Sequence, residues 1–341
     1  MNQYGISRTI LGLALLAYAT ALGNGRGWAA DAPRVRFAAC GTCTSEGVEG
    51  LILKQTNIAE ILGLNLDVLF LPPPQMGAGI ASESLDVEWV GDQPTLAQLA
   101  NQIPIKITGY QFDFELRLEA IPTIESIKDL AGKRIGTPFG TTAYKLASEI
   151  VIDNGFPLSV LANVGPADLG TALSGGQIAA ASVWDPIWGI LEKTYHTKAL
   201  AKEFHTGFVN MRVAFVQTDH VSAVKFLAAQ MLAMAFRANN ADEADRRYET
   251  AFGIAPDIAH AAQVIDRSYA WKDPAAVNLE LLDKDYATLE ATQAFLLKNK
   301  LVPNKVDVKS AIDMSLWKEA RQVIASHAIL VSQIRYVSNA K

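Results

Sequence analysis

The sequence contains little of the material from which metal sites and nucleophilic sites are built. Its 341 residues include two cysteines and five histidines, and no two histidines lie three or four residues apart. The motifs G-x-S-x-G, G-x-x-x-x-G-K-[ST], G-x-G-x-x-G and H-E-x-x-H are all absent. These absences argue against the hydrolase, P-loop, dinucleotide-binding and zincin classes. We expect no catalytic residue, no metal and no cofactor.

Excess positive charge and long apolar runs are also missing. The formal net charge of −5 gives no electrostatic reason to bind nucleic acid. The apolar run Ile10–Leu22 is too short to span a bilayer comfortably, and small residues ending in Ala29-Ala30 follow it. This pattern predicts a secretory signal over residues 1–30, cleaved near its end, and hence a periplasmic protein; the rival interpretation is an uncleaved membrane anchor. Cleavage would remove two arginines and no acid, which takes the net charge from −5 to −7.

Apolar strands and amphipathic helices alternate over the first two thirds of the chain. The helical spacing is clearest at Ala143, Leu146, Ala147 and Ile150, which recur on one face. Such alternation predicts parallel sheets flanked by helices, and the pattern restarts near residue 120, which indicates two lobes. The predicted strands are 34–39, 66–71 (closed by three prolines at 72–74), 85–90, 105–110, 134–137, 160–164, 179–184 and 208–216. Beyond residue 221 the chain is predicted to be mostly helical.

Four loops fall at the carboxyl ends of predicted strands, which is the edge where open α/β sheets bind ligands. Three of these loops lead into helix N-termini, whose free N–H groups suit an anion or a polar oxygen. We therefore expect the loops to line a binding cleft. The candidate ligand-binding residues that they contribute are Cys40, Thr42, Cys43, Thr44, Ser45, Asp92, Gln93, Gly140, Thr141, Thr142, Trp184 and Asp185.

Plainer roles remain open for several of these residues. Either threonine of the 140–142 loop could serve only as a helix cap, and Trp184 could pack between the lobes. Arg212 is a cation within the apolar strand predicted over 208–216. It is a further candidate ligand-binding residue if it faces the cleft as a counter-ion, and otherwise it extends outward.

Three segments resemble one protein family. Residues 127–156, IKDLAGKRIGTPFGTTAYKLASEIVIDNGF, closely resemble the opening of the second lobe in periplasmic substrate-binding proteins of the taurine, aliphatic-sulfonate and nitrate type. Residues 165–193 and 85–109 are similar to two further segments of that family. The resemblance implies an α/β fold of the two-lobe, clamp-like periplasmic-binding-protein kind (type II), each lobe a mostly parallel sheet flanked by helices. Lobe 1 would comprise residues 31–119 and 214–341, and lobe 2 residues 120–213.

The same resemblance implies a function. A small anionic or zwitterionic organic solute, such as taurine or another sulfonate, would be captured between the lobes of a monomer and delivered to the permease and ATPase of an ABC importer. Sulfonate oxygens would meet the donors of the 140–142 loop, assisted by Arg212, and an amine could pair with Asp185, Asp92 or Glu46. Two departures leave the solute open. The first loop reads Cys-Gly-Thr-Cys, and the acid that the family carries near Ala180 is missing.

Two other functions stay in view on the same fold. One is a protein that binds or makes a thiamine-pyrimidine precursor, although the denser cysteine motif of those proteins is absent. The other is a ligand sensor that signals through closure of the clamp.

The C-x-x-C formed by Cys40 and Cys43 admits several interpretations. A redox C-x-x-C also lies at the start of a helix that follows a strand, but the two-lobe fold argues against a redox centre here. Two cysteines alone do not complete a zinc site. An exported protein favours a short disulfide between them. Free thiols that contact the ligand are the next alternative.

Overall fold

The computed structural model describes residues 33–327 and 330–337. The predicted signal segment 1–30 lies outside these residues. Eight strands form one sheet in the order β2-β1-β3-β8-β4-β7-β5-β6. The strands are β1 (Arg34–Ala39), β2 (Asn65–Phe70), β3 (Val87–Gly91), β4 (Ile105–Ala120), β5 (Ile135–Thr137), β6 (Leu161–Asn163), β7 (Ala180–Trp184) and β8 (Lys198–Arg212).

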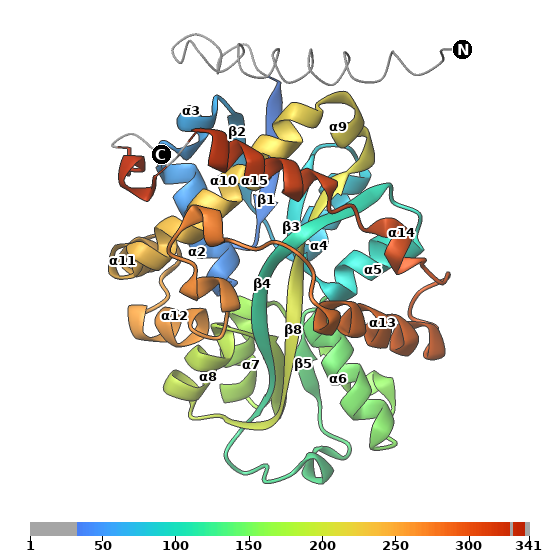
Figure 1. The fold of residues 1–341 in the computed structure, drawn as a ribbon. Helices are drawn as coiled ribbons and strands as arrows, with labels where there is room; N and C mark the ends of the chain where they lie inside the picture. The colour runs from blue at the N-terminus through green and yellow to red at the C-terminus, as the bar shows by residue number, and fades with distance from the viewer. Residues whose placement is uncertain (1–32, 328–329, 338–341) are drawn as a thin grey trace, which may run out of the picture.

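Helices cover both halves of this sheet (Figure 1). Those that precede β8 are α2 (Thr44–Gln55), α3 (Ile58–Leu62), α4 (Pro73–Ala81), α5 (Asp92–Ala100), α6 (Thr142–Asp153), α7 (Leu169–Ser174) and α8 (Ile187–Tyr195). Those that follow β8 are α9 (Val213–Thr218), α10 (His220–Asn239), α11 (Ala241–Phe252), α12 (Pro256–Gln263), α13 (Asp283–Lys298), α14 (Val308–Ala311) and α15 (Ser315–His327).

The two longest strands, β4 and β8, connect the two halves of the molecule. They pair antiparallel from Ile105 opposite Arg212 to Ala120 opposite Lys198. At one end β8 pairs with β3, and at the other end β4 pairs with β7. Each half of the sheet is therefore hydrogen-bonded to one strand of this shared pair. Within the halves the remaining pairings are parallel. Figure 1 shows β4 and β8 running side by side between the two halves. This is the periplasmic-binding-protein fold that the family resemblance implies.

One helix of the described residues, α10, is long and apolar enough to cross a membrane by length and composition. However, 83% of its most apolar stretch is buried inside the protein. It packs in the core of the first half, against α2 and α15. The burial identifies α10 as a core helix of a folded domain.

Three sequence expectations differ from the structure. The strand predicted over 208–216 ends at Arg212, and α9 begins at Val213. The reason is that the partner strand β4 begins directly after Pro104, so it provides no backbone hydrogen bonds for β8 beyond Arg212. The prolines at 72–74 do not simply end a strand. Pro73 and Pro74 form the first turn of α4, where the missing N–H group costs nothing. The strand predicted over 105–110 continues to Ala120, since apolar and polar residues alternate throughout 111–120.

Gly207 of β8 illustrates how tightly the crossover strands are packed. A Cβ atom at this position would lie 1.9 Å from the ring of Phe112, which faces it across the strand pair. We predict that Gly207→Ala lowers the free energy of unfolding by about 1–3 kcal/mol through overpacking, measured by urea denaturation. Gly165→Ala is the control, because the nearest atom to its Cβ lies 3.5 Å away. Equal stability of the two variants would contradict the packing described.

Candidate functional site

A small cavity lies where the two halves of the sheet meet the crossover strands. Its volume is about 30 Å³, room for about two water molecules. Both halves of the molecule line it. The lining residues are Cys43, Glu46, Pro73, Val90, Gly91, Pro94, Phe112, Phe114, Thr141, Thr142, Trp184 and Asp185. The four predicted loops each contribute at least one of them, so the expected edge of the sheet is the edge at which the cavity forms.

Five helices begin at this cavity, and Pro73 of its wall is the first residue of α4. The N-cap residues of α2, α5 and α6 are Cys43, Gly91 and Thr141, and α8 follows Asp185 directly after Pro186. The first N–H groups of a helix have no partner within the helix, and its N-terminus carries partial positive charge. Neither α6 nor α8 has an acidic residue in its first turn to offset this charge. The cavity wall at α6 is therefore suited to a group with several negatively charged oxygens.

Thr141 and Thr142 hold the start of α6 in place. The Thr141 hydroxyl donates to the carbonyl oxygen of Pro138 (2.6 Å) and accepts from the backbone N–H of Tyr144 (3.4 Å). The Thr142 hydroxyl donates to a carboxylate oxygen of Asp92 at 3.0 Å, which joins α6 in one half to α5 in the other. Thr141 therefore caps α6 and also lines the cavity, whereas Thr142 lines the cavity and makes no capping bond.

Two carboxyl groups, those of Glu46 and Asp185, also line the cavity. Asp185 accepts a hydrogen bond from the backbone N–H of Glu115 at 2.9 Å. Burial raises the pKa of Asp185 to about 7. Burial, and then the charge of Asp185, raise the pKa of Glu46 well above its usual range. None of the lining residues is lysine, arginine or histidine, so no cationic side chain of the wall balances this pair.

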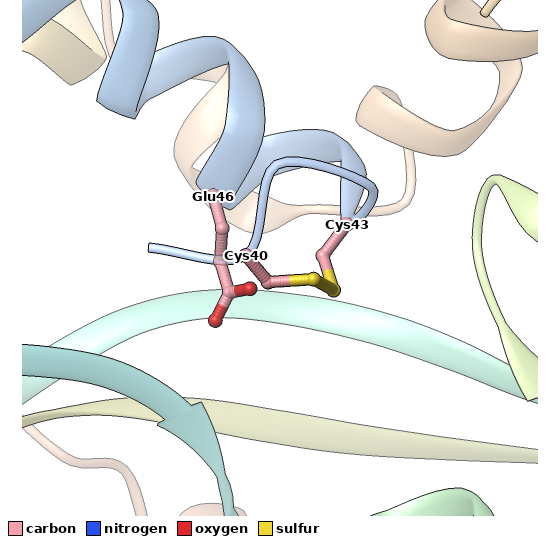
Figure 2. Close-up of side chains that lie close together, drawn as sticks. All are labelled: Cys40, Cys43 and Glu46. Atoms are coloured by element: carbon pink, nitrogen blue, oxygen red, sulfur yellow. A yellow bond between two sulfur atoms is a disulfide. The ribbon is translucent and has the colours of Figure 1, made fainter. Parts of the chain in front are cut away.

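Cys40 and Cys43 are joined by a disulfide at the start of α2. Figure 2 shows the disulfide beside the Glu46 carboxylate. The sulfur atoms and the carboxylate lie within 4.8 Å of one another, which is compatible with a metal site only if the cysteines are free. Because each sulfur is bonded to the other, the disulfide acts here as an uncharged part of the cavity wall.

Asp92, a predicted ligand residue, is engaged in a buried network next to the cavity instead. Besides Thr142, it meets His205 Nδ1 at 3.1 Å and accepts from the Thr292 hydroxyl. Burial alone would lower the pKa of His205, but Asp92 and Glu203 raise it to about 9. Lys145 of α6 also pairs with Glu203, at 2.9 Å. The network ties the two halves of the molecule together directly beneath the cavity.

Arg212 does not reach the cavity, so its predicted role as a counter-ion there is wrong. Its guanidinium pairs with Asp86 at 2.8 Å and with Glu83 at 3.1 Å, at the end of β8 opposite Ile105. Arg36 binds the same Asp86 at 2.6 Å. Burial opposes ionisation of Asp86, but the two arginines lower its pKa. Arg212 serves this surface ion cluster.

The other predicted residues lie around the cavity without lining it. Thr44, Ser45 and Gln93 are buried in the first turns of α2 and α5, whereas Thr42 and Gly140 are exposed. Phe112 and Phe114 form an aromatic wall that was not predicted from the sequence, and their ring centroids lie 4.9 Å apart. The alternation of apolar and polar residues in 111–120, which prolongs β4, is the sequence signal that could have revealed them.

Comparisons with known proteins bear on this fold and site. No protein-family model matches the chain. A protein of Bacillus subtilis (strain 168), provisionally named as an aliphatic sulfonates-binding protein, is 24% identical over 260 residues, which cover 73% of this chain and 75% of that protein. This similarity extends over most of both chains.

Solved structures of sulfonate-binding proteins share the fold of this chain. The alkanesulfonate-binding protein SsuA of Xanthomonas axonopodis pv. citri, bound to MOPS, superposes with a TM-score of 0.65 at 18% identity over 82% of this chain and 98% of that one. The periplasmic aliphatic sulphonate binding protein SsuA of Escherichia coli gives 0.64 at 17% identity, over 83% and 92%. The fold also occurs in an enzyme: a desulfurization enzyme in complex with biphenyl-2-sulfinic acid gives 0.62 at 14% identity, over 85% and 99%.

The buried Asp185 carboxylate predicts a pH-dependent gain of stability in the variant Asp185→Asn. A carboxyl whose pKa is higher in the folded chain binds its proton more tightly there, so ionisation destabilises the fold as the pH rises from about 4 towards 7. Asparagine keeps the acceptor for Glu115 and removes the charge. At pH 8 we expect the variant to be more stable than the natural protein by on the order of 2 kcal/mol, and at pH 4 to show no gain, measured by urea denaturation.

The control for this variant is Asp153→Asn at an exposed position of α6. A similar gain in the control, or a gain from Asp185→Asn that does not depend on pH, would show that ionisation of Asp185 does not destabilise the fold.

Proposed function

We propose that this periplasmic binding protein captures a small organic sulfonate between its two lobes and presents it to the permease and ATPase of an ABC importer. The observation that carries the proposal is the cavity, which both halves of the molecule line and at which five helix N-termini meet. The N-terminus of α6 suits the three oxygens of a sulfonate. The sulfonate-binding names of its relatives support the same class of solute.

The lobes act as a two-state clamp in this proposal. Lobe 1 comprises residues 31–119 and 214–341, and lobe 2 residues 120–213, with β4 and β8 as the connection. The cavity of about 30 Å³ is too small for a sulfonate to enter from outside, so the lobes separate to admit it. A solute that contacts both lobes favours closure by its greater affinity for the closed form. The protein works as a monomer in the periplasm, after its signal segment is removed.

An enzyme on this fold is the second candidate, because a desulfurization enzyme shares it. Two features of the described residues speak for a binding protein instead. The cysteine of the cavity wall is held in a disulfide and provides no thiolate nucleophile. A thiamine-pyrimidine enzyme would need a reactive lysine or histidine facing the cavity, and the wall has neither. A sensor would use the same clamp, and a permease and ATPase encoded beside it would favour transport.

A thermal-shift screen tests the proposed function directly. The panel contains alkane-, aryl- and amino-sulfonates, with nitrate, aromatic carboxylates and pyrimidines for comparison. We expect a sulfonate to raise the melting temperature in a concentration-dependent way, since it binds only the folded state. A shift with none of the sulfonates would refute this solute class, and chemical conversion of any compound would refute the binding-only function.

Closure is expected to depend on Gly91. A Cβ atom at this position would lie 2.5 Å from the Thr142 hydroxyl oxygen and 3.2 Å from the Phe114 ring. Gly91→Ala should therefore push the lobes apart, break the bond from Thr142 to Asp92 and weaken solute binding about tenfold by calorimetry, a loss of about 1.4 kcal/mol.

The double variant Gly91→Ala/Thr142→Ala provides the matched comparison. Removing the hydroxyl removes the clash, so the two losses should not add. Strict additivity would show that Gly91 affects binding by another route.

A further inference from the structure

The start of α2 brings together three side chains of the kinds that bind metal ions. The Sγ atoms of Cys40 and Cys43 and a carboxylate oxygen of Glu46 all lie within 4.8 Å of one another (Figure 2). Within residues 33–327 and 330–337, this is the one trio of histidine, cysteine, aspartate or glutamate side chains whose ligand atoms come so close. In the oxidised protein the sulfur atoms are bonded to each other, so the trio becomes available to a metal only after reduction.

The backbone holds the trio together independently of the bond between the sulfur atoms. The N–H group of Cys43 donates to the carbonyl oxygen of Cys40 at 3.3 Å, and the carbonyl oxygen of Cys43 accepts from the N–H group of Gly47 at 2.7 Å. A Cβ atom at Gly47 would lie 2.6 Å from the carbonyl oxygen of Gly41, so the turn lies directly against the first turn of α2. Glu46 is fixed in that same helical turn. We therefore expect the three ligand atoms to stay close together in the reduced protein.

The set of donors suits a divalent cation of the zinc type. Zinc sites take cysteines in C-x-x-C pairs, and thiolate sulfur is a donor that selects such ions over Mg²⁺ and Ca²⁺. Zn²⁺ binds sulfur at about 2.3 Å and carboxylate oxygen at about 2.0–2.2 Å, so ligands on one tetrahedral ion lie roughly 3.5–4 Å apart. Small side-chain rotations bring the three atoms into that range from their present positions.

The surroundings of the trio also favour a bound cation. Glu46 is 2% exposed and, like Cys43, lines the cavity, where no lysine, arginine or histidine is among the lining residues. No cationic side chain of the wall therefore competes for its carboxylate or repels a metal ion. Cys43 is the N-cap of α2, and the start of a helix favours the thiolate form of a cysteine. Three protein ligands leave one position on a tetrahedral ion, and the cavity of about 30 Å³ has room for the water that would fill it.

We propose that reduction of the Cys40–Cys43 disulfide creates a binding site for one divalent cation of the zinc type, held by the two thiolates and the Glu46 carboxylate. In the reduction a dithiol supplies two electrons and two protons. The bond between the sulfur atoms breaks, two thiols form, and the dithiol becomes a disulfide. The metal ion then displaces the two thiol protons into solvent. This inference does not rest on the proposed function, since it requires no sulfonate.

Metal titration of the reduced and the oxidised protein tests the inference. Dithiothreitol reduces the protein and is then removed in the absence of oxygen, and a thiol assay checks that both cysteines are free. Co²⁺ is the first probe, because cobalt bound to thiolate absorbs through sulfur-to-metal charge transfer. We expect this absorption to saturate at one Co²⁺ per chain in the reduced protein, to disappear on addition of Zn²⁺, and to be absent from the oxidised protein.

Variants identify the ligands. Cys40→Ser and Cys43→Ser each remove one thiolate, and each should weaken Zn²⁺ binding about tenfold or more in the reduced protein. Glu46→Gln keeps both thiolates, so it should weaken Zn²⁺ binding about tenfold or more while the charge-transfer absorption persists at higher Co²⁺. Glu60→Gln, the same substitution at an exposed position of α3, is the matched control and should leave the affinity unchanged. Melting curves of the reduced protein and of each variant check that they fold.

Several results would overturn the inference. One is equal metal binding by the oxidised and reduced proteins, and another is full affinity in Glu46→Gln. A disulfide that dithiothreitol does not reduce in the folded protein, or a loss of the melting transition on reduction, would overturn it as well, because the three ligands would then never be presented together. None of these results bears on whether the oxidised protein binds a sulfonate.

Discussion

The antiparallel pairing of β4 with β8 is the interaction on which the rest of the structure depends. The pair runs through both halves of the sheet, from Ile105 opposite Arg212 to Ala120 opposite Lys198. It carries the aromatic wall at Phe112 and Phe114, and on the facing strand it carries His205. Gly207 lets the Phe112 ring lie against the backbone of β8. Without this shared pair the two halves would have no fixed relation, and no common cavity would form.

Buried charged groups in and next to the wall determine the electrostatic properties of the cavity. The network of Asp92, His205 and Lys145 places compensated charges beneath the cavity and across the two halves. Glu46 and Asp185, by contrast, remain uncompensated by any side chain of the wall. Asp185 therefore costs folding energy at neutral pH, because burial raises its pKa to about 7.

Sequence reasoning located the cavity because the carboxyl ends of parallel strands share one edge. Thr141, Thr142, Trp184 and Asp185 were found from this rule, without knowledge of their contacts. The rule does not reveal which cation meets which acid. Arg212 pairs with Asp86, which is 126 residues away in the chain, so its position could not be read from its own strand.

The fold was predictable to a similar extent. The alternation of strands and helices gives the two α/β halves, and the family resemblance gives their connection. The length of β4 was underestimated because charged residues alternate with apolar residues in its outer half, 112–120. Charged residues suggest exposure to solvent, whereas all residues of this segment are buried. The aromatic wall was missed for the same reason. Burial of that segment depends on neighbouring strands that only the folded chain brings together.

The position of the solute can be seen in a crystal structure of the complex with a sulfonate that raises the melting temperature. We expect its sulfonate oxygens within about 3 Å of the first backbone N–H groups of α6, in the cavity that both halves of the molecule line. A sulfonate bound anywhere else would refute this assignment of the cavity.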